Sequence, residues 1–172
     1  MPFPVAHSLI GVTVAAALAK KSEARWQLLC LSALLGVCPD FDYLLNVLRV
    51  GRGGWHHGFT HSIVFALFVG AIVTLSYDWR SVHGFIVFSA ATASHTLLDY
   101  LMTESRGVSL WWPFTDRRYK FRGPNPIDYT WDDSSFWHAA PDFLRISLTE
   151  LLVFVPILLL VIVVKRYGFP QR

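Results

Sequence analysis

Five long runs of apolar residues, separated by shorter polar segments, dominate the chain. A helix that spans a bilayer needs roughly 20 mostly apolar residues, with about 17 to 25 tolerated. The last three runs reach this length, whereas the first is short and the second is interrupted by Pro39, Asp40 and Asp42. The pattern predicts an all-α fold, a multi-pass transmembrane helical bundle of about five helices. These helices are expected at residues 4–19, 26–48, 59–77, 82–102 and 144–164.

The segment LLVFVPILLLVIVV in the last run favours a membrane over a soluble core. A helix that is apolar on every side is buried either in a large core or in lipid. A chain of 172 residues is too small to surround five such helices. Only 16% of its residues are charged, against about 25% in soluble domains. We therefore predict a single membrane domain over residues 1–172, with the lipid bilayer as its partner.

The basic residues, which give a net charge of +3, mostly flank the apolar runs. Flanking charges of this kind anchor and orient membrane helices, whereas nucleic-acid-binding proteins carry a basic stripe on a polar fold. No nucleic-acid partner is therefore expected. The two cysteines, Cys30 and Cys38, lack the spacing of a metal-binding pair and are expected to be buried thiols.

Residues 103–143 differ in composition from the apolar runs on either side. They contain Trp111, Trp112, Trp131 and Trp137 among proline, glycine and aspartate. Because tryptophan concentrates at the membrane–water boundary, we predict a Trp-rich interfacial loop that folds back over the helix ends. A lid or a substrate-binding loop is the alternative interpretation.

Histidine and aspartate residues collect at one side of the predicted bundle, the face on which the N-terminus lies. Ionisable groups within spanning segments are costly and usually mark a functional site. His57 with His61, and His95 with Asp99, have the i,i+4 spacing that places two side chains on one side of a helix. The residues that alternating helices bring to this face are His7, Asp40, Asp42, His56, His57, His61, His95 and Asp99.

These residue types are those of a metal centre. Imidazole and carboxylate groups suit zinc, iron and manganese, and a tetrahedral zinc takes four ligands. A larger set of candidates predicts two or more divalent ions, zinc foremost, with a bridging carboxylate; such two-metal sites are common in phosphoester-cleaving enzymes. Each residue alone has a plainer explanation: His7 as a hydrogen-bonded core histidine, the aspartates as a helix cap, and His95 with Asp99 as a structural hydrogen bond. Their joint placement favours the metal centre.

The segments AHSLIG, LLGVCPDFDYL, HHGFTHSIV and SHTLLDYL, followed by WWPF, resemble the YdjM/DUF457 family of inner-membrane metal-dependent hydrolases. Their order and spacing match the family pattern over residues 5 to 114. The family has an arginine at the position of His57, so whether His56 or His57 is the ligand stays open. The resemblance implies an inner (plasma) membrane protein whose metal ligands are His7, Asp40, Asp42, His56, His61, His95 and Asp99.

We expect from these features a membrane-embedded metal-dependent hydrolase, phosphoesterase-like or phospholipase-like, that acts on a phosphoester or lipid-linked substrate. Metal ions lower the pKa of a bound water from about 15.7 to about 7. Asp42 and His57 are the predicted catalytic residues, Asp42 to exchange a proton and His57 to orient groups at the site. Thr60, Ser62 and Ser94 are expected to orient ligands.

Two other classes of protein carry similar residues. A metal transporter would bind the ion in transit, and a non-catalytic membrane scaffold would use the metal for folding. A transporter needs polar residues through the full thickness of the membrane, which the third and fifth apolar runs lack. The charges of the short loops favour a cytoplasmic location for the face opposite the N-terminus, which predicts an extracytoplasmic site.

Overall fold

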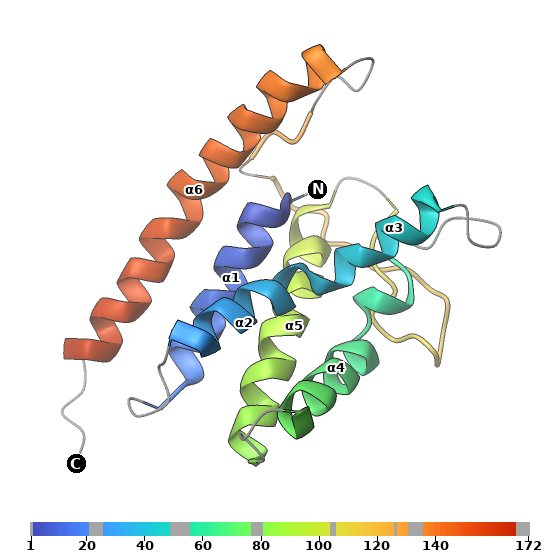
Figure 1. Cartoon of the computed structure of the whole chain (residues 1–172). Coiled ribbons are helices and arrows are strands. Elements are labelled where there is room, and N and C mark those ends of the chain that lie inside the picture. The colour runs from blue at the N-terminus through green and yellow to red at the C-terminus, as the bar shows by residue number, and fades with distance from the viewer. Residues whose placement is uncertain are drawn as a thin grey trace.

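The computed structural model describes residues 2–20, 26–48, 56–76, 81–103, 106–125, 127–130 and 136–167. These residues form the helices α1 (Pro4–Leu18), α2 (Trp26–Val37), α3 (Asp42–Val47), α4 (Ile63–Ser76), α5 (Val82–Met102) and α6 (Phe136–Tyr167), and the 3-10 turns η1 (Cys38–Phe41) and η2 (Phe59–His61) (Figure 1). Outside the helices, Val108 and Tyr119 form an isolated antiparallel bridge. The predicted all-α fold is confirmed.

Three helical stretches among the described residues are long and apolar enough to cross a membrane: Trp26–Leu45, Val82–Met102 and Ala139–Tyr167. Helices α1 and α4 are apolar but shorter. With its 15 residues, α1 extends over roughly 22 Å, less than the ~30 Å of a hydrocarbon core. It packs against α2, α5 and α6, which shelter it on several sides.

The predicted second helix, residues 26–48, is broken in the structure. Helix α2 ends at Val37, the turn η1 follows, and α3 starts at Asp42. Pro39 lies at the start of η1, where its missing N–H and its ring disfavour a continuous α-helix. Helix α6 differs in the other direction, since it begins at Phe136 rather than at residue 144. Pro141 and Asp142 interrupt the apolar run, so the pattern places the start of this helix after them.

Helices α1 and α2 approach each other through two glycines. A Cβ atom at Gly11 would lie 2.4 Å from the carbonyl oxygen of Ser32, and one at Gly36 would lie 2.3 Å from the carbonyl oxygen of His7. Both distances are too short for a real side chain, so only glycine permits this contact, as is common between membrane helices. The contact places the end of α2 directly beside His7.

Helix α6 holds both ends of α1. The buried Glu150 carboxylate accepts hydrogen bonds from the backbone N–H groups of Phe3 (2.6 Å) and Ala6 (2.9 Å). At the C-terminal end of α1, Lys165 of α6 donates to the backbone carbonyls of Ala16 (2.7 Å) and Ala17 (2.8 Å). An acid at the N-terminus and a base at the C-terminus both complement the helix dipole. The two helices therefore run in the same direction, and the start of α1 is fixed in place.

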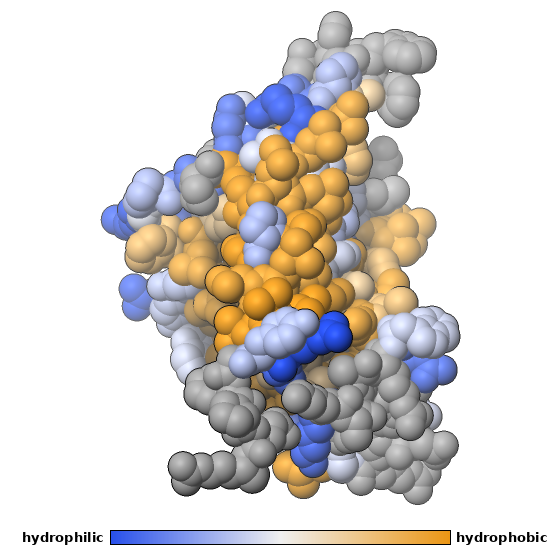
Figure 2. All heavy atoms as spheres, turned by 90° about the vertical axis from the view of Figure 1, so that its left-hand side faces the viewer, coloured by the Kyte–Doolittle hydropathy of each residue, from blue (hydrophilic) through white to orange (hydrophobic). Residues whose placement is uncertain are grey.

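The outer side of α6 is an apolar band with hydrophilic residues at both ends (Figure 2). Leu152 is 77% exposed and Leu160 is 62% exposed on this helix. Large exposed apolar surfaces of this kind are those that lipid covers. Cys30 is also exposed and Cys38 is half-buried, so the expectation of two buried thiols is wrong. Cys30 lies on the outer side of α2. An apolar run does not indicate whether a given residue faces lipid or the protein core.

Candidate metal centre

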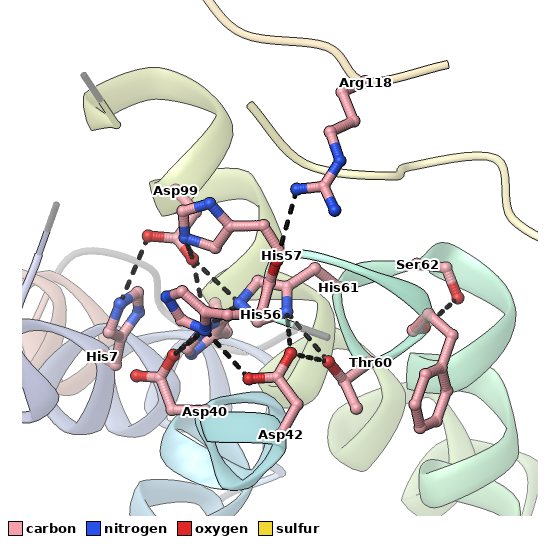
Figure 3. A network of polar contacts seen from close by, with 12 residues as sticks. His7, Asp40, Asp42, His56, His57, Thr60, His61, Ser62, Asp99 and Arg118 are labelled. Atoms are coloured by element: carbon pink, nitrogen blue, oxygen red, sulfur yellow. Dashed lines mark hydrogen bonds and ion pairs between the residues drawn. The ribbon is translucent and has the colours of Figure 1, made fainter. Parts of the chain in front are cut away.

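Separate parts of the chain bring their histidines and aspartates to one cluster (Figure 3). The cluster draws on the start of α1, the turn η1, the first residue of α3, the segment leading into η2, and the last turns of α5. It contains the residues predicted to meet on one face: His7, Asp40, Asp42, His56, His57, His61, His95 and Asp99. That any of them binds a metal ion stays a prediction.

Four of these residues offer ligand atoms that all lie within 4.8 Å of one another: Asp40, His61, His95 and Asp99. The Nε2 atoms of His61 and His95 are 3.0 Å apart. The Oδ2 atom of Asp99 lies 3.1 Å from the first and 3.2 Å from the second. Ligands of a tetrahedral zinc, at about 2.0–2.1 Å from the ion, are separated by roughly 3.3 Å. The donor set therefore has the size of a single zinc site.

Hydrogen bonds at the back of the two rings turn their Nε2 atoms toward this site. His95 Nδ1 lies 2.7 Å from the carbonyl oxygen of Gly36, which only accepts, so Nδ1 carries the proton and Nε2 presents its lone pair. His61 Nδ1 lies 3.3 Å from Asp42 Oδ2. This arrangement, in which an acceptor fixes the tautomer of a histidine, is typical of metal-binding histidines.

The site attracts positive charge. Burial lowers the pKa of His61, but its hydrogen bonds to Asp40 and Asp42 outweigh this effect and hold the pKa well above the ordinary value. Both carboxylate oxygens of Asp99 are buried and face histidine ring nitrogens at 3.1–3.5 Å, and the buried Nδ1 atom of His7 has no hydrogen-bond partner among the described residues. Buried polar atoms without partners are rare and need an explanation, and a metal cation among these atoms supplies one.

Asp42 lies behind the histidines. Its Oδ1 is 2.9 Å from His56 Nδ1, and its Oδ2 accepts a hydrogen bond of 2.5 Å from Thr60 in addition to facing His61. The geometry therefore suits an orienting carboxylate, while direct ligation and proton exchange by Asp42 stay predictions. The expected orienting role fits Thr60. Ser62 and Ser94 instead donate to the backbone carbonyls of Phe59 and Ala91.

A second group of ligand atoms lies beside the first. His56, His57 and His61 are close enough to share an ion, and His57 Nε2 is 3.6 Å from Asp99 Oδ2. On the other side, His7 Nε2 is 3.5 Å from Asp99 Oδ1, and the ring of His7 stacks on that of His95. Asp99 thus lies between histidines on two sides, as a bridging carboxylate would. Both His56 and His57 belong to the cluster, so the choice between them stays open.

The loop after α5 holds the His56–His57 segment. Arg118 donates a hydrogen bond of 3.2 Å to the carbonyl oxygen of His56, and the N–H of Ser109 donates one of 3.1 Å to that of His57. His57 has a φ of 61°, which is uncommon for a residue other than glycine and clusters at functional sites. Burial lowers the pKa of His57 to about 3 and so keeps its imidazole neutral, the form that binds metals.

Several contacts of the site lie beyond what the sequence motifs indicated. The Gly36 carbonyl is a backbone group, which no residue pattern reports. Arg118 lies far from the histidines along the chain, in a segment without periodicity. Glu150 carries a usable signal, because it is an acid inside the last apolar run, and such groups usually have a specific partner.

The comparisons with known proteins agree with the motif resemblance. The family model described as YdjM inner membrane protein matches residues 1–169. Inner membrane protein YbcI of Escherichia coli (strain K12) is 30% identical over 125 residues, which cover 69% of this chain and 72% of the relative. No solved structure matches the chain significantly. The chain therefore belongs to the YdjM family of inner membrane proteins, and within that membrane it carries a buried histidine–aspartate cluster that could hold a metal ion.

Proposed function

We propose that the chain is a metal-dependent hydrolase of the inner membrane that cleaves a phosphoester or lipid-linked substrate. The observation that carries the proposal is the donor set of Asp40, His61 and His95 with Asp99, which has the dimensions of a metal site. A bound divalent ion would supply an activated water at neutral pH and charge stabilisation for the developing oxyanion.

Among the described residues, the cluster is exposed at one edge. The side chains of His7, His61, His95 and Asp99 are fully buried, and that of His57 is 3% exposed, whereas Asp40 is 15% exposed and His56 is 19% exposed. Water and substrate would therefore approach along Asp40 and His56. A buried side closed by protein and one accessible edge are features of catalytic metal sites, which keep a coordination position open.

Two residues remain candidates for moving protons. Each oxygen of Asp42 already faces a donor, which favours its role in orienting His56 and His61. His57 lies beside the metal ligands, with its Nε2 atom 3.6 Å from Asp99 Oδ2, but its low pKa makes it a weak base, which favours a role in orienting the attacking water over taking its proton.

The two other classes fit less well. Below the cluster, α5 buries Val87, Phe88 and Ala91 in an apolar core with α1 and α2, and an ion crossing the membrane would have to pass this core. A scaffold with a structural metal would account for the buried ligands and for the four donors, since structural zinc sites are saturated with four protein ligands. The accessible edge and the second donor group of His56, His57 and His61 are what favour the hydrolase.

The test uses the purified protein in lipid nanodiscs, stripped of metal with a chelator and then loaded with zinc or manganese. It is assayed with 4-nitrophenyl phosphoesters and with phospholipids. We expect hydrolysis that requires the metal and is lost in Asp99→Ala but kept in Asp116→Asn, which changes an exposed acid. Metal-loaded protein that hydrolyses none of these substrates, or an Asp99→Ala variant with the wild-type rate, would refute the proposal.

A further inference from the structure

A cavity of about 490 Å³ adjoins the accessible edge of the cluster. It lies between the start of α1, the turn η1 and the start of α6. Asp40 and His56 line it, and they are the two cluster residues whose side chains are partly exposed. The remaining lining residues are valine, proline, phenylalanine and tyrosine, among them Val37, Phe41 and Phe143. The cavity thus has one polar end at the metal centre and apolar walls elsewhere.

The walls of the cavity continue onto the outer surface. Phe41 is 65% exposed, Tyr43 is 60% exposed and Phe143 is 49% exposed, and all three lie on the membrane-spanning stretches that start at Trp26 and Ala139. Phe143 packs against Phe3 with ring centroids 5.2 Å apart. An apolar molecule in the bilayer can therefore reach the cavity between these rings without crossing water.

The size and chemistry of the cavity select its occupant. A volume of 490 Å³ holds about sixteen groups of the size of a water molecule, which is comparable to a hydrocarbon chain of medium length. Ligand pockets of this volume usually carry a few polar groups that fix orientation, and here those groups are Asp40 and His56 at the metal end. An apolar peptide would bring backbone N–H and C=O groups against walls that offer few partners, at a high cost in desolvation.

We infer that this cavity binds the hydrocarbon chain of an amphiphilic phosphoester and presents its phosphate to the metal centre. The inference rests on the proposed function, because it identifies the substrate class of that site. The source of the chain is the surrounding membrane, and the phosphate end meets the cluster at the Asp40 and His56 edge.

The first experiment detects binding without any reaction. A dodecyl phosphate with a diazirine at the end of its chain is added to the zinc-loaded protein in nanodiscs and activated by light. Adducts are expected in the peptides that contain Phe41, Tyr43 and Phe143, and unlabelled dodecyl phosphate should remove them while methyl phosphate should not. Adducts spread evenly over the lipid-facing helices would overturn the inference, as would their removal by an apolar peptide but not by dodecyl phosphate.

The second experiment measures turnover of two diesters, dodecyl and methyl 4-nitrophenyl phosphate. In both, water adds to phosphorus and 4-nitrophenolate leaves. Val37→Trp fills the cavity from α2, and Leu34→Trp, at a 65% exposed position on the same helix, is its matched control. We expect Val37→Trp to lower the dodecyl-to-methyl rate ratio about tenfold, the effect of exposing roughly two methylenes. Leu34→Trp should change the ratio by less than about twofold.

A second pair of variants covers the case in which Val37→Trp fails to fold. Phe143→Ser opens the mouth of the cavity, and Leu144→Ser changes its neighbour, which is 59% exposed. Only Phe143→Ser should lower labelling and the rate ratio, and equal ratios in the two variants would contradict the inference.

The two proposals fail in different ways. Labelling of the cavity in a protein that hydrolyses neither diester would support the chain-binding cavity and count against the hydrolase. Metal-dependent hydrolysis with equal rates for both diesters and no cavity adducts would support the hydrolase and overturn the chain-binding cavity.

Discussion

Replacing Asp42 by asparagine tests whether this residue orients the histidines or binds the metal itself. The substitution keeps the size of the side chain but removes its charge and one acceptor oxygen. In the structure one carboxylate serves three groups: His56 Nδ1 at 2.9 Å, His61 Nδ1 at 3.3 Å and Thr60 Oγ1 at 2.5 Å. An amide has one acceptor oxygen for them, and its N–H₂ group can only donate.

The expected size of the effect follows from these contacts. At least one histidine loses the acceptor that fixes its tautomer, and loss of such an outer partner typically weakens metal affinity about 10–100-fold. This corresponds to about 1.4–2.7 kcal/mol of binding free energy. The number of bound ions should stay the same, because Asp40, His61 and His95 with Asp99 keep their ligand atoms.

The assay is a zinc titration of the stripped protein in nanodiscs, in competition with a chromophoric chelator, together with metal analysis by mass spectrometry. Asp116→Asn is the control for loss of one acidic charge at an exposed position. Wild-type affinity in Asp42→Asn would refute the orienting role. A loss of one bound ion at unchanged affinity for the others would show that Asp42 is a ligand.

Three further predictions concern the site and its support. Asp99→Ala should abolish tight zinc binding while the protein stays in the membrane fraction, as metal analysis and fractionation would show. Gly36→Ala should lower the melting temperature, because its Cβ would lie 2.3 Å from the carbonyl oxygen of His7 and overpacking typically costs about 1–3 kcal/mol; an unchanged melting curve would contradict the close helix contact. Glu150→Gln should destabilise the fold by about 0.5–2 kcal/mol, the usual effect of losing a helix N-cap, in thermal unfolding compared with Asp142→Asn on the same helix.

The apolar pattern predicted where helices occur but not how they end or break. Runs of apolar residues report contact with lipid or core, and they missed the first turns of α6 because Pro141 and Asp142 interrupt the run there. The break at η1 had a local signal in Pro39. Its consequence, that Asp40 and Asp42 both face His56, depends on packing against the rest of the molecule.

The sequence predicted which residues gather in the cluster, because consecutive membrane helices run in opposite directions. A polar residue near a helix end can therefore lie at only one of two membrane faces. Residues near the same membrane face lie at a similar depth in the bilayer. Burying an ionisable group in a membrane costs free energy, so such groups usually occur at functional sites. The roles within the cluster did not follow. That His95 bonds to the Gly36 carbonyl, and that Asp42 faces the rear of two imidazoles, depends on rotamers and on the approach of α1 and α2.

The broken second helix is what allows both aspartates to serve one site. In a continuous α-helix, Asp40 and Asp42 would project about 200° apart around the axis and could not face the same histidine. With η1 between α2 and α3, their carboxylates lie 4.0 Å and 2.9 Å from the same nitrogen, His56 Nδ1. The residue between them, Phe41, lines the apolar cavity. The turn η1 therefore places Asp40 at the accessible edge of the cluster, Asp42 behind the histidines and Phe41 in the wall of the cavity. These three placements explain why the helix is interrupted here, since a helix that only spans the membrane would need no such turn.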